Sequence, residues 1–313
     1  MNDVNNVKFF ENPSLNKKSV CPKCKGRGLV INEDNTVEYC DCILSSKEPL
    51  LKTMNIPRRY WSIANKSDIL NTENANCSYT NAYISVLDYV NKFKENSGKG
   101  LFFIGPPGVG KTYLSIFLLL YLEEKYKIRG LFYDVRTLIA DLKTLIGKDR
   151  YATDNNMSSY DKLLSKIIKT PILVLDDLGS EVLTDYNRDI ITYIIASRYN
   201  DMKPIVITTN FDLTRYDIHP KDVGLEDKPA IKNNKKKMDT ITLQSQKIPF
   251  EKERQNQEDI HGRVFSYKDL PNALRGDLAL RLGDSIASRL GEMCNFVYMF
   301  GKDRRALKSK KGT

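Results

Sequence analysis

Residues 101–122 read LFFIGPPGVGKTYLSIFLLLYL. A short apolar run leads into a glycine-rich loop, and a long apolar helix is predicted from Gly110 onward. The loop, GPPGVGKT at 105–112, fits the pattern G-x-x-x-x-G-K-[ST] between a strand and a helix. Glycines there let backbone N–H groups turn inward toward phosphate oxygens, and the following helix adds its positive end. The stretch therefore predicts a nucleotide-phosphate site at the end of a buried strand.

The side chains of this loop have separate predicted roles. Lys111 is expected to reach the β- and γ-phosphates as a catalytic residue, and the Thr112 hydroxyl to ligate Mg²⁺. ATP and Mg²⁺ are therefore the predicted substrate and cofactor. A chance match is disfavoured because a strand, a helix and a second, acidic strand are all in place. The predicted nucleotide-binding residues are Gly105, Pro106, Pro107, Gly108, Val109, Gly110, Lys111 and Thr112.

A second buried strand ends in two carboxylates. PILVLDD at 171–177 places Asp176 where it can join the magnesium shell. Asp177 follows as the predicted catalytic residue that polarises the attacking water. Many related sites use glutamate at this second position, so the shorter aspartate implies a closer water or slow turnover. Glu181 is a competing candidate, although a loop or helix-capping acid is the simpler interpretation.

Another apolar strand, PIVITTN at 204–210, ends in a polar side chain. Asn210 is placed to touch the γ-phosphate or the water, and we include it among the predicted catalytic residues. Taken alone, an asparagine in the turn after a strand is the simpler interpretation. The two preceding motifs favour the catalytic one.

Apolar runs alternate with helical stripes along most of the chain. Five strands are predicted, at 101–104, 130–135, 171–177, 204–210 and 295–300, with helical segments between them. Strands rich in valine, isoleucine and leucine are typical of a parallel sheet that is buried on both faces. The predicted fold is therefore α/β, an αβα P-loop core with a five-stranded parallel sheet.

In series, these motifs resemble a known family. GPPGVGKT, LVLDDLGSE, SRYNDMKPIVITTN and GDSIASRLGEMCNFVYMFGKDRR are similar to the AAA+ ATPases of the DnaC/DnaI helicase-loader and IstB-like branch, as is NIPRRYW at 55–61. The resemblance covers roughly residues 55–215 and 276–305. It implies a five-stranded AAA+ core whose helical lid is reduced or absent. It also implies a homo-oligomer that hydrolyses ATP at its subunit interfaces, with a replicative helicase and single-stranded DNA as partners.

The resemblance also bears on three arginines. Arg289, in SRL, matches the arginine finger of the family, which would enter a neighbouring subunit's site and stabilise the transferring phosphoryl group. Arg305, in the G-x-D-x-R ending, is either a second phosphate-sensing arginine or a solvated residue of the tail. Arg198, in SRY, is assigned to packing or an ion pair.

Four of the six cysteines cluster in CPKCKGRGLVINEDNTVEYCDC at 21–42. Cys21, Cys24, Cys40 and Cys42 form C-x2-C and C-x-C pairs around a predicted hairpin, which suits a closed tetrahedral zinc shell. An iron–sulfur cluster could use the same residues, but the ribbon-like pairing favours zinc. A redox role is disfavoured because a thioredoxin-like context is missing. Some members of the loader branch have zinc-binding N-termini that contact the helicase, and the resemblance implies the same here.

Charge and composition divide the chain further. The 313 residues carry a net charge of +10, which favours an anionic partner, nucleic acid above all. The connection between Asn210 and Arg289 is usually short in the family, whereas here it contains a polar, partly disordered insertion. The predicted segments are a zinc-binding module at 1–45, a helical connector at 46–97, the ATPase core at 98–305 with the insertion at 221–275 inside it, and a basic tail at 306–313.

The sequence predicts a cytoplasmic protein of a bacterium, a phage or another mobile element, with no membrane partner. The first eighteen residues lack the apolar run of a secretory signal. The most apolar segment, 113–122, is too short to cross a bilayer. In the reducing cytosol clustered cysteines favour a metal, and the isolated Cys77 and Cys294 are expected to be ordinary thiols.

Three functions remain open. The favoured one is an ATP-dependent replication factor that loads a replicative helicase onto single-stranded DNA, with slow hydrolysis that depends on assembly or DNA. The second is an IstB-like helper that marks target DNA for a transposase, and it would not need the cysteine module. The third is a zinc-ribbon adaptor whose nucleotide site is a weakly hydrolysing switch, which Asp177 in place of glutamate keeps open.

Overall fold

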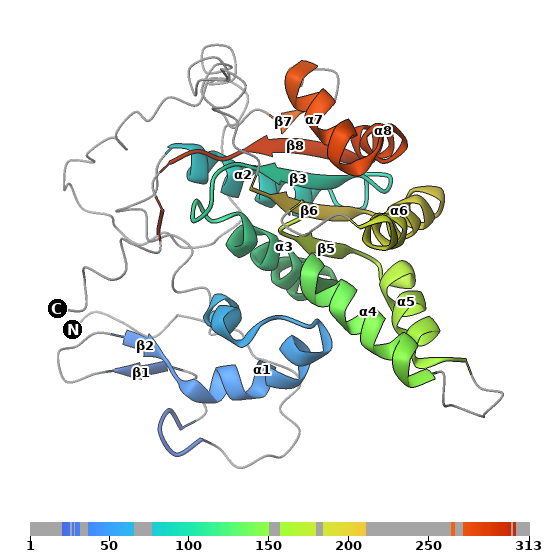
Figure 1. Cartoon of the computed structure of the whole chain (residues 1–313). Coiled ribbons are helices and arrows are strands. Elements are labelled where there is room, and N and C mark those ends of the chain that lie inside the picture. Colours follow the sequence, from blue (N-terminus) through green and yellow to red (C-terminus); the bar gives the residue numbers. More distant parts are fainter. Residues whose placement is uncertain are drawn as a thin grey trace, which may run out of the picture. The chain divides into compact units, whose positions relative to one another are not determined.

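The structure is a computed structural model of the whole chain (Figure 1). It describes residues 21–25, 27, 29–31, 37–65, 77–149, 157–179, 184–210, 264–266, 272–301 and 303–304. The chain divides into two compact units, Met1–Glu48 and Pro49–Thr313. Within the described ranges, each helix is too short or too polar to cross a membrane.

The first unit contains a hairpin followed by a helix. Strand β1 (Leu29–Ile31) pairs antiparallel with β2 (Val37–Tyr39), and Val30 lies opposite Glu38. Helix α1 (Asp41–Thr53) begins directly after the hairpin and continues into the second unit. The hairpin predicted between the two cysteine pairs is therefore present.

A six-stranded sheet forms the centre of the second unit, in the order β4-β5-β6-β3-β8-β7. The first five strands of this order run parallel, which confirms the predicted parallel sheet. The sixth, β7, is antiparallel to β8 and lies within the predicted insertion. At two residues it is too short to show as an apolar run. The strands are β3 (Gly100–Ile104), β4 (Leu131–Asp134), β5 (Leu173–Asp176), β6 (Ile205–Thr209), β7 (Val264–Phe265) and β8 (Cys294–Tyr298).

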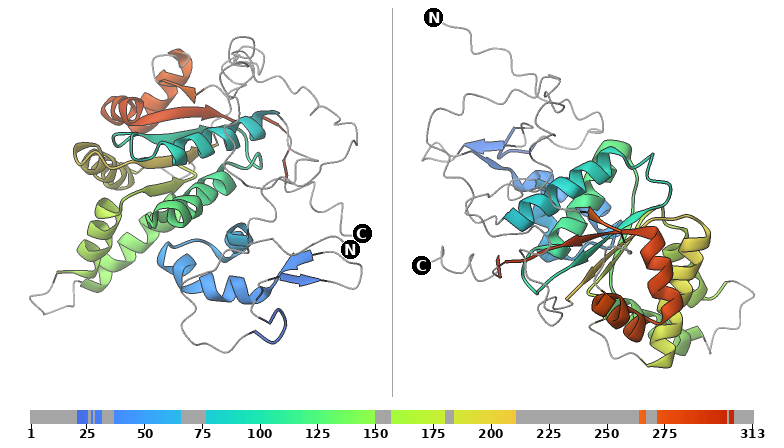
Figure 2. Two further views of the ribbon diagram at one scale, coloured as in Figure 1. Left: turned by 180° about the vertical axis from the view of Figure 1, so that it is seen from behind. Right: turned by 90° about the horizontal axis from the view of Figure 1, so that it is seen from above.

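Helices cover both faces of this sheet, as the views from behind and above also show (Figure 2). Successive side chains of a strand point to opposite faces. Leu101 and Phe103 accordingly join a core with η1, α2 and α3, while Phe102 and Ile104 join a second core with α4 to α8. The helices are η1 (Arg58–Asn65), α2 (Cys77–Asn91), α3 (Lys111–Tyr126), α4 (Val135–Asp149), α5 (Ser159–Lys169), α6 (Asp185–Asn200), α7 (Asn272–Leu282) and α8 (Asp284–Met293).

Arg198, near the end of α6, is completely buried. Its Nη1 donates to the carbonyl oxygens of Ile167, Ile168 and Thr170, where α5 ends, at 2.9–3.0 Å. Its Nη2 donates to the carbonyl oxygen of Pro204, just before β6, at 2.6 Å. One guanidinium therefore holds three segments together. Of the two expected roles, packing and an ion pair, these contacts support packing.

Several predictions fall on residues outside the described ranges. They concern Glu181, Arg305, the basic tail 306–313 and most of the insertion 221–275. The prediction of a reduced or missing lid refers to residues after Arg304, which also lie outside the described ranges, so it stays a prediction.

Candidate functional site

The phosphate loop joins β3 to α3 at the carboxyl ends of the parallel strands. Gly108 and Gly110 have φ angles of 80° and 109°, in the left-handed region that favours glycine. A Cβ atom on Gly108 would lie 2.1 Å from Oδ1 of Asp303. A Cβ atom on Gly110 would lie 2.8 Å from Cε2 of Tyr79. The left-handed backbone therefore favours glycine at both positions, and a larger residue would also displace the side chains of Asp303 and Tyr79.

The amine of Lys111 is enclosed by this loop. Its Nζ donates to the carbonyl oxygens of Gly105 and Pro106, both at 2.7 Å. It also donates to Oδ1 of Asn210 at 2.8 Å. Asn210 is the residue that directly follows β6. Lys111 is buried, with 6% of its surface exposed, so a compact positive charge is fixed at the centre of the loop. Such a charge is suited to bind phosphate.

Asp176 lies at the end of β5 with its carboxylate buried. The hydroxyl of Thr208 donates to its Oδ1 at 2.6 Å. Burial raises the pKa of Asp176 above its ordinary value, and the neighbouring charges of Asp177 and Asp134 raise the pKa further. Hydrogen bonds from Thr208 and Thr112 act in the opposite direction. The structure therefore brings together the two residues predicted to hold Mg²⁺, Thr112 and Asp176.

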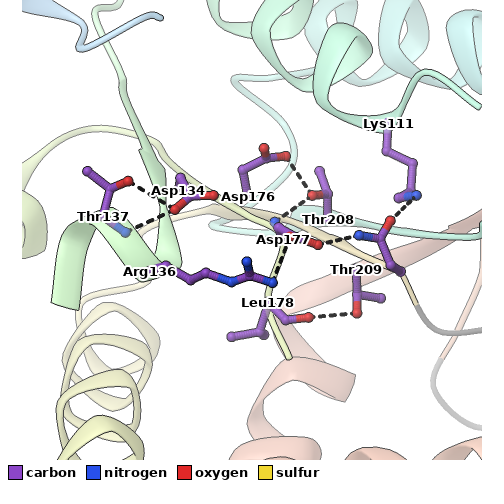
Figure 3. A network of polar contacts seen from close by, with 10 residues as sticks. Lys111, Asp134, Arg136, Thr137, Asp176, Asp177, Leu178, Thr208 and Thr209 are labelled. Atoms are coloured by element: carbon purple, nitrogen blue, oxygen red, sulfur yellow. Dashed lines mark hydrogen bonds and ion pairs between the residues drawn. The ribbon is translucent and has the colours of Figure 1, made fainter. Parts of the chain in front are cut away.

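Asp177 occupies the next position and joins a polar network (Figure 3). Its backbone is left-handed, with φ of 62°, and its N–H donates to the hydroxyl of Thr208 at 2.9 Å. Nδ2 of Asn210 donates to Oδ1 of Asp177. Nη2 of Arg136 lies 3.8 Å from Oδ2 of Asp177. Lys111, Asn210, Asp177 and Arg136 therefore form a continuous chain of contacts between the loop and the start of α4.

The end of β4 and the start of α4 add two residues that sequence reasoning missed. Asp134 lies opposite Asp176 in the parallel register. Its Oδ1 accepts hydrogen bonds from the backbone N–H and the hydroxyl of Thr137, at 2.9 and 3.1 Å. Arg136 follows and reaches Asp177. The strand prediction at 130–135 contained a signal for Asp134, since parallel strands present their last residues at the same edge.

Comparison with known proteins identifies the family. The family model for IstB-like ATP-binding proteins matches residues 80–233. The crystal structure of the DnaC helicase loader is 30% identical to this chain with a TM-score of 0.50, and the match covers 78% of this chain and 100% of that chain. The chain belongs to the family of DnaC and the IstB-like ATP-binding proteins.

Two curated relatives fit the same family. The replicative helicase loader DnaI of Bacillus subtilis (strain 168) is 27% identical over 128 residues, which are 40% of this chain and 38% of DnaI. The ATP-binding protein of insertion sequence IS5376, from Geobacillus stearothermophilus, is 29% identical over 117 residues, 37% of this chain and 41% of its own length. The match spans only about two-fifths of these curated relatives.

This DnaC-family chain adds a further contact to its phosphate loop from the segment after β8. The guanidinium carbon of Arg304 lies 3.9 Å from the centre of the Tyr79 ring. The backbone N–H of Arg304 donates to the carbonyl oxygen of Gly108 at 3.0 Å. The arginine that contacts the loop is thus the neighbour of Arg305, the predicted phosphate sensor, which lies outside the described residues.

Arg289, which is predicted to match the arginine finger of the family, lies on α8. Its Nη1 donates to the hydroxyl of Ser285 at 2.7 Å, and its guanidinium carbon lies 6.0 Å from the centre of the Tyr199 ring. Among the described residues, these are the hydrogen bond and the ring contact of its guanidinium, and neither involves the phosphate loop of its own chain. A finger that acts on a neighbouring subunit is expected to lie away from its own site.

The four clustered cysteines converge in the first unit. Their sulfur atoms all lie within 4.8 Å of one another. The Sγ atoms of Cys21 and Cys40 are 3.7 Å apart, and those of Cys24 and Cys42 are 3.4 Å apart. Sulfurs around a tetrahedral zinc ion, with Zn–S bonds of about 2.3 Å, are about 3.8 Å apart. The donor set and its spacing therefore fit zinc.

The surroundings of the sulfurs also suit a bound cation. Burial raises the pKa of the Cys42 thiol, and contacts with the other three cysteines raise the pKa further. The backbone N–H groups of Cys24 and Lys23 instead lower the pKa of Cys21. Four adjacent sulfurs can all be thiolates only beside a positive charge. The turn itself has Lys25 in the left-handed conformation.

Proposed function

We propose that this protein is an ATPase that hydrolyses ATP to ADP and phosphate at the interfaces of an oligomer. One observation supports this most: Asn210 joins the amine of Lys111 to the carboxylate of Asp177 at the mouth of the phosphate loop. A phosphate-binding cation and a water-activating carboxylate are thus linked through one amide. Hydrolysis needs both groups on the two sides of the γ-phosphate.

Each residue then has a role in the reaction. When ATP binds, the amine of Lys111 gives up its hydrogen bonds to the loop carbonyl oxygens and donates to the β- and γ-phosphates instead. Thr112 and Asp176 would hold Mg²⁺, which neutralises phosphate charge when it is bound. Asp177 orients the attacking water and accepts its proton, while Asn210 holds Asp177 and touches the γ-phosphate. Arg289 of one subunit stabilises charge on the phosphoryl group in the next subunit.

A mixing assay tests this proposal. Lys111→Ala should abolish ATP binding and hydrolysis, and Arg289→Ala should abolish hydrolysis alone. A mixture of the two variants should recover part of the turnover, because Lys111→Ala subunits supply fingers to intact sites. Lys92→Ala, an exposed lysine paired with Asp88, is the matched control and should behave as wild type. Undiminished turnover in Lys111→Ala would refute the ATPase, and ATP binding without turnover in the wild type would favour the adaptor.

As a biological role we propose that the ATPase loads a replicative helicase onto single-stranded DNA in the cytoplasm. Similarity to the crystal structure of the DnaC helicase loader and to the helicase loader DnaI supports this role. We assign the helicase contact to a zinc-bound module at residues 1–45, and phosphate contacts along DNA to the excess of 10 positive charges.

A transposition helper is the second candidate, because the chain is 29% identical to the ATP-binding protein of insertion sequence IS5376. An affinity pull-down from host lysate separates the two roles, with the full chain and a version that lacks residues 1–45 as baits. Recovery of a hexameric helicase by the full chain alone supports the loader. Recovery of a transposase by both baits supports the helper.

A further inference from the structure

Tyr199 connects α6 to the helix that carries Arg289. It follows the buried Arg198 in the SRY motif and is half-buried itself. Its hydroxyl donates a hydrogen bond to Oε2 of Glu292 on α8. The face of its ring lies 6.0 Å from the guanidinium carbon of Arg289. One side chain therefore contacts both charged groups.

Arg289 and Glu292 are three residues apart on the same helix, so their side chains are neighbours and are able to form an ion pair. In that pair the carboxylate would offset the charge of the guanidinium and hold it on its own subunit. Instead Glu292 is engaged by the Tyr199 hydroxyl, and Arg289 is bound to Ser285 and the ring face. The hydrogen bond and charge of Glu292 also raise the pKa of Tyr199, so the phenol keeps its proton.

We propose that Tyr199 is a positioning residue for the arginine finger, and this inference rests on the proposed function. Its hydroxyl holds Glu292 away from Arg289, and its ring supports the guanidinium through a weak cation–π contact. Such a contact orients the finger without neutralising it. The guanidinium can then leave the ring when a neighbouring subunit presents a nucleotide.

Three variants separate this role from simple packing. Tyr199→Phe keeps the ring and removes the hydroxyl, which frees Glu292 to pair with Arg289. Glu292→Gln removes the charge that would capture the finger. The double variant Tyr199→Phe, Glu292→Gln combines both changes, and it should recover whatever activity is lost through capture of Arg289. Recovery is not expected if Tyr199 only supports the packing of α6 on α8.

The assay uses full-length subunits in the mixture described above. Lys111→Ala subunits donate fingers, and Arg289→Ala subunits provide intact nucleotide sites. Tyr199→Phe in the donor should lower turnover by about two- to five-fold, the size expected from one exposed ion pair. The same change in the acceptor should leave turnover unchanged. Glu292→Gln added to the donor should restore it, with unchanged binding of a fluorescent ATP analogue and an unchanged melting temperature.

The outcomes distinguish this inference from the proposal beneath it. An inactive mixture of Lys111→Ala and Arg289→Ala subunits overturns the finger in trans, and this inference with it. An active mixture in which Tyr199→Phe in the donor has no effect overturns the inference alone. So does a loss that Glu292→Gln does not restore.

Discussion

A hydrogen bond of 2.8 Å joins the amine of Lys111 to Oδ1 of Asn210, across two neighbouring strand ends of the sheet. The other end of the same amide donates to Asp177. One amide therefore connects the amine of Lys111 to the carboxylate of Asp177. A nucleotide that attracts Lys111 would alter the hydrogen bonds of Asp177 in the same step.

Asn210→Ala should reduce ATP turnover more than ATP affinity. The change leaves the loop glycines and their N–H groups intact but removes the amide that holds Asp177. We expect kcat to fall by roughly 10- to 100-fold, less than the roughly 10²–10⁴-fold contribution of a general base itself because Asp177 stays in place, with less than about a five-fold rise in Kd. Steady-state turnover and binding of a fluorescent ATP analogue measure the two effects. Asn200→Ala, an exposed asparagine at the end of α6, is the control. Equal losses in kcat and affinity would contradict this role.

Asp176→Asn should stabilise the nucleotide-free protein and abolish hydrolysis. Burial raises the pKa of Asp176 in the folded state, so folding favours the protonated acid. The stabilising contribution of this group is complete below the ordinary aspartate pKa of about 3.9 and is lost as the pH rises through the higher folded pKa. At pH 7 the neutral asparagine avoids the cost of a buried charge.

The expected gain in melting temperature at pH 7 is about 2–4 °C, which corresponds to roughly 1 kcal/mol for a domain of this size. The difference from wild type should shrink as the pH approaches 4. Asp161→Asn, at an exposed position on α5, is the matched control. A lower melting temperature for Asp176→Asn at pH 7 would show that hydrogen bonds to the carboxylate outweigh its burial.

The parallel sheet and the loop were predictable because both are encoded locally. Strands such as LVLD are apolar up to their last residue, and the glycines of GPPGVGKT specify the backbone of the loop. Asp176 was predicted to lie at the site because it is the last residue of its strand. Local pattern was sufficient here because parallel strands place their last residues at one edge.

Contacts between distant segments were not predictable in this way. Arg304 reaches Tyr79 across the sequence, and Arg136 reaches Asp177 from a different strand end. Neither pair has a characteristic spacing, and the position of each depends on how whole elements pack. The contact between Arg289 and Tyr199 is a similar case, because α6 and α8 are separated in the sequence by the insertion and pack together only in the fold.

Removal of zinc should unfold the cysteine module and spare the ATPase sheet. The purified chain is expected to contain one zinc ion per molecule, measured by atomic absorption. Cys24→Ser should lose it, because a structural site needs all four ligands. Cys77→Ser, which lies on α2, should retain the metal. ATP binding should be unchanged after treatment with a chelator. Detection of iron with visible absorbance in place of zinc would contradict this assignment.

Asp303→Asn should strengthen nucleotide binding. The Asp303 carboxylate packs directly against Gly108, so its negative charge lies beside the loop that we expect to receive phosphates. An amide of the same shape removes the repulsion, and we expect Kd to fall by about two- to five-fold at low ionic strength. The difference should decrease at 0.5 M salt because exposed charges are screened. Asp201→Asn, which precedes β6 at the opposite edge of the sheet, should have no effect. Weaker binding by Asp303→Asn would indicate that the carboxylate supports the loop instead.

Arg198→Met should destabilise the fold without a catalytic defect. Methionine fills much of the same volume, but the carbonyl oxygens of Ile167, Ile168, Thr170 and Pro204 lose their shared donor. Buried acceptors left without a partner are costly, and we expect a loss of about 2–4 kcal/mol in the free energy of unfolding. Urea denaturation followed by circular dichroism measures it. Arg188→Met, an exposed arginine on the same helix, should change stability by less than about 0.5 kcal/mol. Turnover per folded molecule at low temperature should match wild type, because the contacts of Arg198 lie where α5 ends and just before β6, whereas Asn210 follows the other end of that strand. A selective loss of turnover with normal stability would instead place this arginine in the reaction.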